Sequence, residues 1–254
     1  MSNEVVKTNV LDEISNKLEK YIEVKDILLE NEYSEALQDS FSILKLLRNA
    51  NTLIAKKRFE SFLNGFNSKE LIPEAKLQKL RDYIDNTKKA EYIADLFSKV
   101  FLSNSKIACT IMGVIAHNLI DNKQEISHKD LICAEAITKF FDDDIKNYEF
   151  IFSYIEVYMN KHKGVKRRGF EMDRHFTAFC KEKNVDKDSI ILTLEKAVSN
   201  QLLIRENDVD LNIDENSVDT SSVDYYEFYL PTAPGEQLYK YIQKLNSFFW
   251  NDVG

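Results

Sequence analysis

The fold of the C-terminal part is decided by two stretches, Leu194-Glu-Lys-Ala-Val-Ser-Asn-Gln-Leu-Leu-Ile204 and Tyr229-Leu-Pro-Thr-Ala-Pro-Gly-Glu-Gln-Leu-Tyr239. The first has apolar residues at helical spacing and then a short apolar run at its end, which is typical of a helix that leads into a strand. The second begins within an alternating run over 225–230 and continues into Pro234-Gly-Glu, where a helix can start. Together they predict a β-hairpin between two helices.

The sequence predicts two further helical segments upstream of this hairpin. A short helix is expected over 171–183, and Asp186 or Asp188 can cap a second helix that ends near Asn200. Between the two predicted strands lies a long segment rich in Asp, Asn and Ser. We expect its residues 207–223 to form an exposed and poorly ordered loop, because few of them could pack against a core.

The resulting order is helix, turn, helix, strand, long loop, strand, helix, and it resembles the winged-helix superfamily. In the second quoted stretch, Thr232, Gly235 and Leu238 hold the places of the pattern YxLTxxGxxL, and Pro231 is inserted as a departure from it. The resemblance covers roughly residues 149–246. It implies the fold but little about function, since winged helices bind DNA, RNA or proteins.

The rest of the chain is predicted to be helical. Only six Gly and three Pro serve the 254 residues, which favours long helices with few turns. The segment 107–120 is apolar nearly all round and should be a central core helix. Ser127 and Asp130 form a capping-box pattern, Thr87 is expected as an N-cap, and Gly65 is expected in the left-handed conformation after a helix.

We therefore expect a mainly α protein with an N-terminal multi-helix domain and a C-terminal winged-helix domain that contains a small β-hairpin. The first domain should span 1–160 and the second 161–254, with a basic linker at 161–169. Within the first, Lys57-Arg-Phe-Glu-Ser-Phe-Leu-Asn-Gly65 resembles the RxxxFL segments of uncharacterised bacterial proteins of phages and defence islands, including abortive-infection proteins. No catalytic residues accompany that resemblance.

One run of positive charge stands out in a chain whose net charge is -8. We call it the basic stretch; its members are Lys161, Lys163, Lys166, Arg167 and Arg168. It could converge on a phosphate or a carboxylate, or it could be a solvated linker, or it could pair with the acidic loop. A second basic group, expected to be a solvated face, comprises Lys45, Arg48, Lys56, Lys57 and Arg58.

The residues that a winged helix would use on DNA argue against DNA reading. The helix before the hairpin offers Lys187, Ser189, Thr193, Lys196 and Asn200 to a groove, against the acids Asp186, Asp188 and Glu195. The hairpin segment has one base, Arg205, among the acids Glu206, Asp208, Asp210, Asp214, Glu215, Asp219, Asp224 and Glu227. These carboxylates would repel phosphates, so the loop is either a solvated loop or a protein-binding wing.

The sequence contains no recognisable catalytic or metal-binding motif: GxxxxGK[ST], GxGxxG, HExxH, GxSxG and CxxC are all absent. We expect Cys109, Cys133 and Cys180 to be free buried thiols, and His117 to be a hydrogen-bonded structural histidine. The run Asp142-Asp-Asp144 is expected to favour a helix N-terminus rather than to hold a cation. His175 and Cys180 do not face a common point of their helix.

These observations predict a non-enzymatic cytoplasmic protein-interaction or regulatory factor without a cofactor. The N-terminal resemblance suggests a phage or mobile-element accessory or defence protein. The partner is expected to be another protein, and no secretory signal or membrane span is visible. The alternative is a nucleic-acid-binding regulator that contacts phosphates through the basic stretch.

Overall fold

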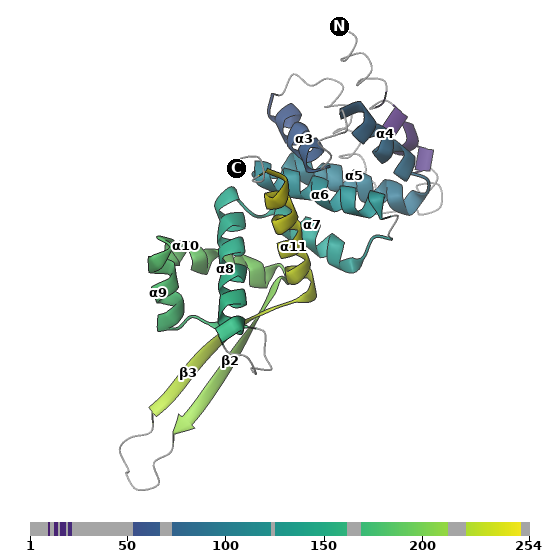
Figure 1. Ribbon diagram of the computed structural model, residues 1–254. Coiled ribbons are helices and arrows are strands. Elements are labelled where there is room, and N and C mark those ends of the chain that lie inside the picture. The colour runs from purple at the N-terminus through teal and green to yellow at the C-terminus, as the bar shows by residue number, and fades with distance from the viewer. Residues whose placement is uncertain are drawn as a thin grey trace. The chain divides into compact units, whose positions relative to one another are not determined.

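The computed structural model describes residues 10, 13–14, 16–18, 20–21, 53–66, 73–122, 125–161, 169–212 and 222–249. These residues form a mainly helical protein with a three-stranded antiparallel sheet (Figure 1). The chain divides into two compact units: a first unit of residues 1–142 and 241–254, and a second unit of residues 143–240. The mainly helical class that the sequence predicted is therefore present.

The helices of the first unit are α3 (Leu53–Gly65), α4 (Pro73–Tyr83), α5 (Thr87–Leu102), α6 (Lys106–Asp121) and α7 (His128–Thr138). The apolar helix α6 is the core helix that the sequence predicted, and Ile111 at its centre is fully buried. The capping box of Ser127 and Asp130 is present at the start of α7. The N-cap of α5 is Asn86 and not Thr87, because the Asn86 side chain accepts a hydrogen bond from the backbone N–H of Lys89.

Two glycines set the distance between α3 and α6. A Cβ atom added at Gly113 would lie 2.0 Å from the carbonyl oxygen of Phe62, and one added at Gly65 would lie 1.9 Å from that of Thr110. Gly65 is the last residue of α3, with no positive φ, so the left-handed cap expected from the sequence is wrong. Glycine is needed here because the two backbones touch, a contact that no local pattern announces.

The second unit contains α8 (Asp142–Lys161), β1 (Phe170–Glu171), α9 (Arg174–Glu182), α10 (Lys187–Ser199), β2 (Leu203–Asn212), β3 (Ser222–Pro231) and the start of α11 (Ala233–Phe249). The sequence placed the domain boundary after residue 160, whereas nearly all of α8 belongs to this unit. Helix α8 belongs to the second unit because of aromatic packing. The centre of the Tyr154 ring lies 5.7 Å from that of Phe170 and 4.9 Å from that of Phe176.

The strand order is β1-β3-β2, with both pairings antiparallel. Strand β1, which pairs Phe170 with Tyr229, was not predicted from the sequence. The sequence pattern placed the start of a helix at 171, whereas α9 starts only at Arg174. Asp173 delays that start by capping the helix, accepting hydrogen bonds from the backbone N–H groups of His175 and Phe176. A two-residue strand has no periodicity that a sequence pattern could reveal.

The hairpin strands are longer than predicted. The ladder continues from Leu203↔Pro231 to Asn212↔Ser222, although the apolar runs end at 204 and begin at 225. The expected poorly ordered loop is thus wrong for 207–212 and 222–223, and its residues 213–221 lie outside the described residues. Backbone hydrogen bonds propagate a hairpin from its buried base, and they need no apolar side chains to do so.

Candidate interaction surface on the second unit

Helix α10 starts at a strong local cap and carries a polar stripe along one side. Asp186 caps it by accepting hydrogen bonds from the backbone N–H groups of Asp188 and Ser189. The stripe consists of residues spaced by four, three and four positions, which places them on one helix face: Ser189, Thr193, Lys196 and Asn200. Together with Lys187, these are the residues that the sequence offered to a DNA groove.

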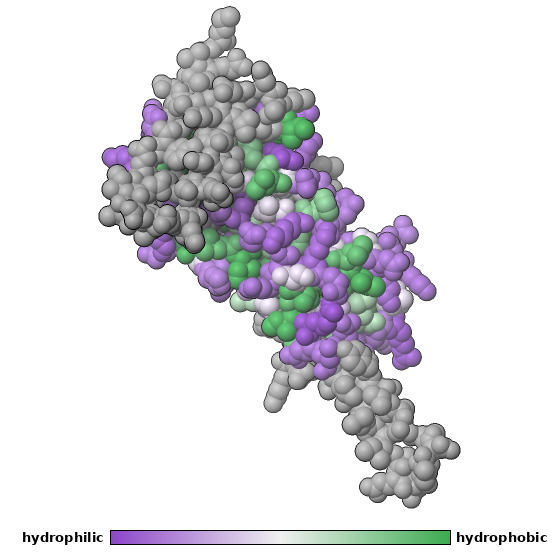
Figure 2. All heavy atoms as spheres, turned by 180° about the vertical axis from the view of Figure 1, so that it is seen from behind, coloured by the Kyte–Doolittle hydropathy of each residue, from purple (hydrophilic) through white to green (hydrophobic). Residues whose placement is uncertain are grey.

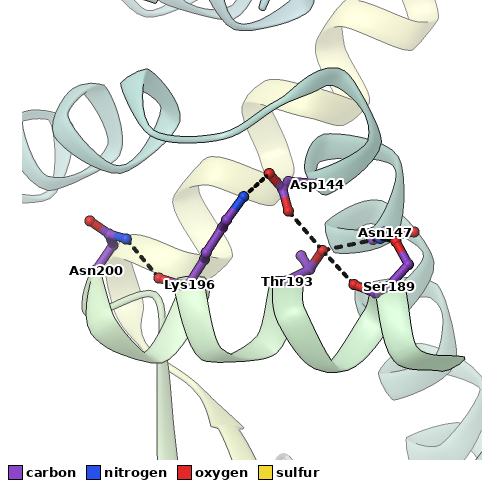
Figure 3. Close-up of polar contacts among 6 residues, drawn as sticks. All are labelled: Asp144, Asn147, Ser189, Thr193, Lys196 and Asn200. Atoms are coloured by element: carbon purple, nitrogen blue, oxygen red, sulfur yellow. Dashed lines mark hydrogen bonds and ion pairs between the residues drawn. The ribbon is translucent and has the colours of Figure 1, made fainter. Parts of the chain in front are cut away.

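Three residues of the stripe, Ser189, Thr193 and Lys196, are bound to α8, whereas Asn200 donates to the Lys196 carbonyl of its own helix (Figure 3). Asp144 accepts a hydrogen bond from the Thr193 hydroxyl at 3.1 Å and from the Lys196 ammonium at 2.5 Å. Asn147 donates from its side-chain amide to the hydroxyls of Ser189 and Thr193, at 2.8 and 3.1 Å. The side chain of Thr193 is completely buried. These contacts hold α10 against α8 by its polar side.

Thr193 and Lys196 are therefore engaged within the second unit rather than directed to a nucleic acid in this structure. The expected exposure was wrong for Thr193, which is fully buried, and the carboxylate of Asp144 binds both Thr193 and Lys196. Helix α10 is described throughout, and its only bases are Lys187 and Lys196. Lys187 lies 3.3 Å from the Thr177 hydroxyl and is half-buried, so both cations have intramolecular partners.

The side of α10 that lies one residue, about 100°, around the helix from the polar stripe is exposed, and its line of residues contains no base. Leu192 is 65% exposed and lies at helical spacing between the exposed acids Asp188 and Glu195. Ile191 and Val198 are half-buried beside this line. We call Asp188, Leu192 and Glu195 the outward face of α10. On the side of the molecule drawn in Figure 2, apolar side chains likewise form separate patches bordered by hydrophilic ones.

Arg205, at the base of β2, is engaged by carboxylates of the same unit. It forms ion pairs with Glu195 of α10 and, at 3.1 Å, with Glu227 of β3. Its guanidinium also lies 5.6 Å from the centre of the Tyr229 ring. The pKa of Arg205 is raised, chiefly by the hydrogen bond with Glu195. The base that the sequence singled out in the hairpin thus faces two carboxylates rather than a phosphate.

The basic stretch falls almost wholly outside the described residues. Lys161 ends α8, and its side chain is not described; Lys163, Lys166, Arg167 and Arg168 lie beyond the described part of the chain. In the second basic group, Lys56 and Lys57 are exposed, and Arg58 donates a hydrogen bond to the backbone carbonyl of Phe101. Lys45 and Arg48 of this group lie outside the described residues.

The three cysteines are buried and form no disulfide, as predicted. Burial raises the pKa of the Cys109 thiol to about 11 and that of Cys133 to about 12, so both thiols are protonated at neutral pH. Burial also raises the pKa of Cys180. Protonated, buried thiols are poor nucleophiles and poor metal ligands.

His117 and the aspartate run have structural surroundings. His117 Nδ1 is buried without a hydrogen-bond partner, whereas Nε2 lies 3.4 Å from Asp121, so the expected hydrogen-bonded ring is only half satisfied. Burial lowers the pKa of His117. Asp142 accepts a hydrogen bond from Ser105, and Asp144 binds α10, so these carboxylates serve different partners. Among the described residues, no three ligating side chains form a metal-binding group.

No protein-family model, curated protein or solved structure matches this chain. In the described part of the chain, no helix has both the length and the apolar character to cross a membrane.

The sequence missed the outward face of α10. Ile190, Ile191, Leu192 and Leu194 form a nearly continuous apolar run, so periodicity alone leaves open which of them pack inside. Asp188 and Glu195, which flank Leu192 at helical spacing, could have indicated that this face of the helix is exposed. Only the tertiary contacts of Asp144 with the polar stripe show which side of the helix is outside.

Proposed function

We propose that the second unit is a winged helix that binds another protein through the outward face of α10 and does not read DNA with this helix. The element order α8, β1, α9, α10, β2, β3 supports the winged-helix assignment, as does the strand order β1-β3-β2. In this arrangement α10 is the helix that DNA-binding members place in the major groove.

The observation that carries the proposal is the orientation of α10. Ser189, Thr193 and Lys196 of its polar side are bound by Asp144 and Asn147, and its outward face presents an exposed leucine between two acidic residues. Phosphates would meet the carboxylate of Asp188 on that side, whereas a protein partner could cover Leu192 and pair with Asp188; Glu195 is already engaged by Arg205. The outward face therefore suits a partner with an apolar centre and a basic rim.

At the level of the whole chain, we propose a non-enzymatic interaction or regulatory factor. The surface just described supports the interaction part of this proposal. The assignments to the cytoplasm and to a phage accessory or defence system stay predictions from the sequence. The alternative, phosphate binding through the basic stretch, also stays a prediction and has its own test below.

The test is capture of partners from a nuclease-treated lysate of the cells that encode the protein. Wild-type protein should retain a specific partner, and Leu192→Asp should reduce its recovery by about tenfold or more, the effect expected of a central contact residue. Leu131→Asp is the matched control, because Leu131 is also exposed but lies on α7 of the first unit.

Two results would contradict the proposal. One is equal loss of the partner with Leu131→Asp and Leu192→Asp. The other is tight, sequence-specific binding to duplex oligonucleotides that is lost on Lys187→Glu, which would restore α10 as a DNA-reading helix.

A further inference from the structure

The core of the first unit contains a buried carboxylate, that of Asp130 in the first turn of α7, which is 6% exposed. A buried carboxylate is stable only where hydrogen-bond donors surround it. Its Oδ2 accepts from the backbone N–H and the hydroxyl of Ser127, at 3.1 and 2.6 Å, and its Oδ1 accepts from the Tyr241 hydroxyl at 2.7 Å. An ionised carboxylate has about four acceptor positions, so these bonds leave one position on Oδ1.

Two tyrosine hydroxyls of the same unit are buried and lack a hydrogen-bond partner. They belong to Tyr83, the last residue of α4, and to Tyr92 of α5, which are 8% and 4% exposed. Neither hydroxyl oxygen has a donor or an acceptor within hydrogen-bond distance among the residues that the structure describes. A hydroxyl buried in this way loses its bonds to solvent without replacement, which destabilises the folded state. Both hydroxyls therefore point to a small polar ligand.

Ion pairs on both sides of Tyr92 hold α5 alongside α7. One turn before Tyr92, Lys88 lies 3.8 Å from the carboxylate of Glu125, and two turns after it, Lys99 lies 3.4 Å from that of Glu135. The chain therefore runs in the same direction through α5 and through the segment that forms α7. Tyr92 lies between the two lysines and the buried carboxylate lies between the two glutamates, so they come level with each other.

Further contacts bring Tyr83 to the same place. Lys89, in the first turn of α5, lies 4.8 Å from the centre of the Tyr83 ring. Burial raises the pKa of Tyr83, and the charges of Asp85 and Asp130 add to this effect. Burial also raises the pKa of Tyr92, with Asp130 as the next contribution. Both phenols are therefore protonated at neutral pH, so each can donate a hydrogen bond.

We propose that one internal water molecule is bound here, accepting hydrogen bonds from the hydroxyls of Tyr83 and Tyr92 and donating one to Oδ1 of Asp130. Internal waters typically make about three hydrogen bonds to buried polar groups, which is the number that this arrangement supplies. The water satisfies both hydroxyls and fills the remaining acceptor position of the carboxylate. It joins α4, α5 and α7 through bonds of fixed direction, and these restrict the rotation of the helices more narrowly than apolar contacts do.

The direct test is a crystal structure of the full chain at a resolution that locates ordered water. We expect an electron-density peak at about 2.7–3.2 Å from both hydroxyl oxygens and from Oδ1 of Asp130. The crystal structure of the Tyr92→Phe variant should show the peak weakened or absent, because the water then keeps only two of its three partners.

The sign of the effect of Tyr92→Phe distinguishes a water-bound hydroxyl from an unpartnered one. Removal of a hydroxyl that binds water should make hydrogen exchange in peptides from α5 and α7 about fivefold faster, the effect of one neutral hydrogen bond. Removal of an unpartnered hydroxyl would instead slow exchange, because a buried polar atom is replaced by an apolar ring. Tyr83→Phe should also speed exchange.

The double variant Tyr83→Phe with Tyr92→Phe tests whether the two hydroxyls share one water. Its effect should differ by more than about twofold from the product of the single effects, because residues with a common partner are coupled. The matched control is Tyr148→Phe in the second unit, where the buried hydroxyl donates directly to the Gly235 carbonyl at 3.1 Å. It should leave exchange in α5 and α7 unchanged within about twofold.

Three outcomes would overturn the proposal. The first is a crystal structure in which the two hydroxyls reach Asp130 directly, or in which no density peak lies between them. The second is slower exchange in the Tyr92→Phe variant than in the wild type. The third is a double variant whose effect equals the product of the two single effects, since each hydroxyl would then act alone.

Discussion

Replacing Thr193 by valine tests whether the polar stripe holds α10 against α8. The Thr193 hydroxyl donates to Asp144 and accepts from Asn147, and its side chain is fully buried. Valine has nearly the same shape and helix propensity, so the change removes these two hydrogen bonds together with the bond from the hydroxyl to the Ser189 carbonyl within α10. A buried bond to a charged acceptor contributes about 1.5–3 kcal/mol, and a neutral one about 1 kcal/mol.

Part of that loss is offset, because Asp144 keeps Lys196, Asn147 keeps Ser189, and the added methyl group is buried. We therefore expect the opening of α10 to become easier by about 2 kcal/mol, which corresponds to roughly thirtyfold faster exchange. The assay is hydrogen exchange by mass spectrometry on peptides from α8 and α10. This reads the second unit directly and does not require the two units to unfold together.

Thr138→Val is the matched control. The Thr138 hydroxyl bonds to the carbonyl of Ala134 one turn earlier, at 2.8 Å, just as the Thr193 hydroxyl reaches the carbonyl of Ser189 at 3.1 Å. The control lacks the contacts between helices, so its effect on its own helix should stay below about 0.5 kcal/mol. Equal effects in the two variants would refute the reasoning, because the stripe would then not fix the outward face of α10.

Four further predictions concern other parts of the molecule. Gly113→Ala should destabilise the first unit by about 3 kcal/mol in urea unfolding, because the new methyl group would meet the Phe62 carbonyl at 2.0 Å; a change below 0.5 kcal/mol would show that the helices can separate freely. Burial lowers the pKa of His117, so the folded state favours the neutral ring, and stability should fall as pH drops from about 6.5 toward the lower folded-state pKa. The His117→Phe variant should lose less stability than wild type in that window, and an identical loss would mean that another group is responsible. Joining Glu206 to Phe228 by Asn-Gly should barely move the thermal midpoint, since neither Asn207 nor Glu227, the two removed residues whose burial is described, is buried; loss of cooperative unfolding would show that the distal hairpin is structural. If the protein binds nucleic acid, changing every residue of the basic stretch to Gln should abolish salt-sensitive oligonucleotide binding, and binding that survives the change would place the contact elsewhere.

Local chemistry explains why much of the secondary structure could be predicted. The capping box of Ser127 and Asp130, the cap at Asp186 and the apolar segment of α6 all depend on neighbours within one or two helical turns. Each was present where the sequence predicted it. The alternating run over 225–230 also predicted β3, although the strand pairs with β2 over a longer stretch than the sequence predicted.

The candidate surfaces could not be predicted in the same way. Which side of α10 is exposed depends on Asp144 and Asn147, which lie far from α10 along the chain. The position of Glu171 opposite Phe228 depends on the pairing of β1 with β3, and the two-residue strand left no trace in the sequence pattern.

The sequence by itself determined the helical character of the chain, the caps of several helices and the negative charge of the hairpin, because these follow from composition and short-range spacing. Only the tertiary structure decided that Gly65 and Gly113 let two backbones touch, that Lys196 is paired with Asp144, and that Leu192 faces outward. The physical reason is that burial and pairing are properties of residues brought together by packing. A helix with apolar residues on several sides can be docked in more than one rotation, and the choice is made by its distant partners.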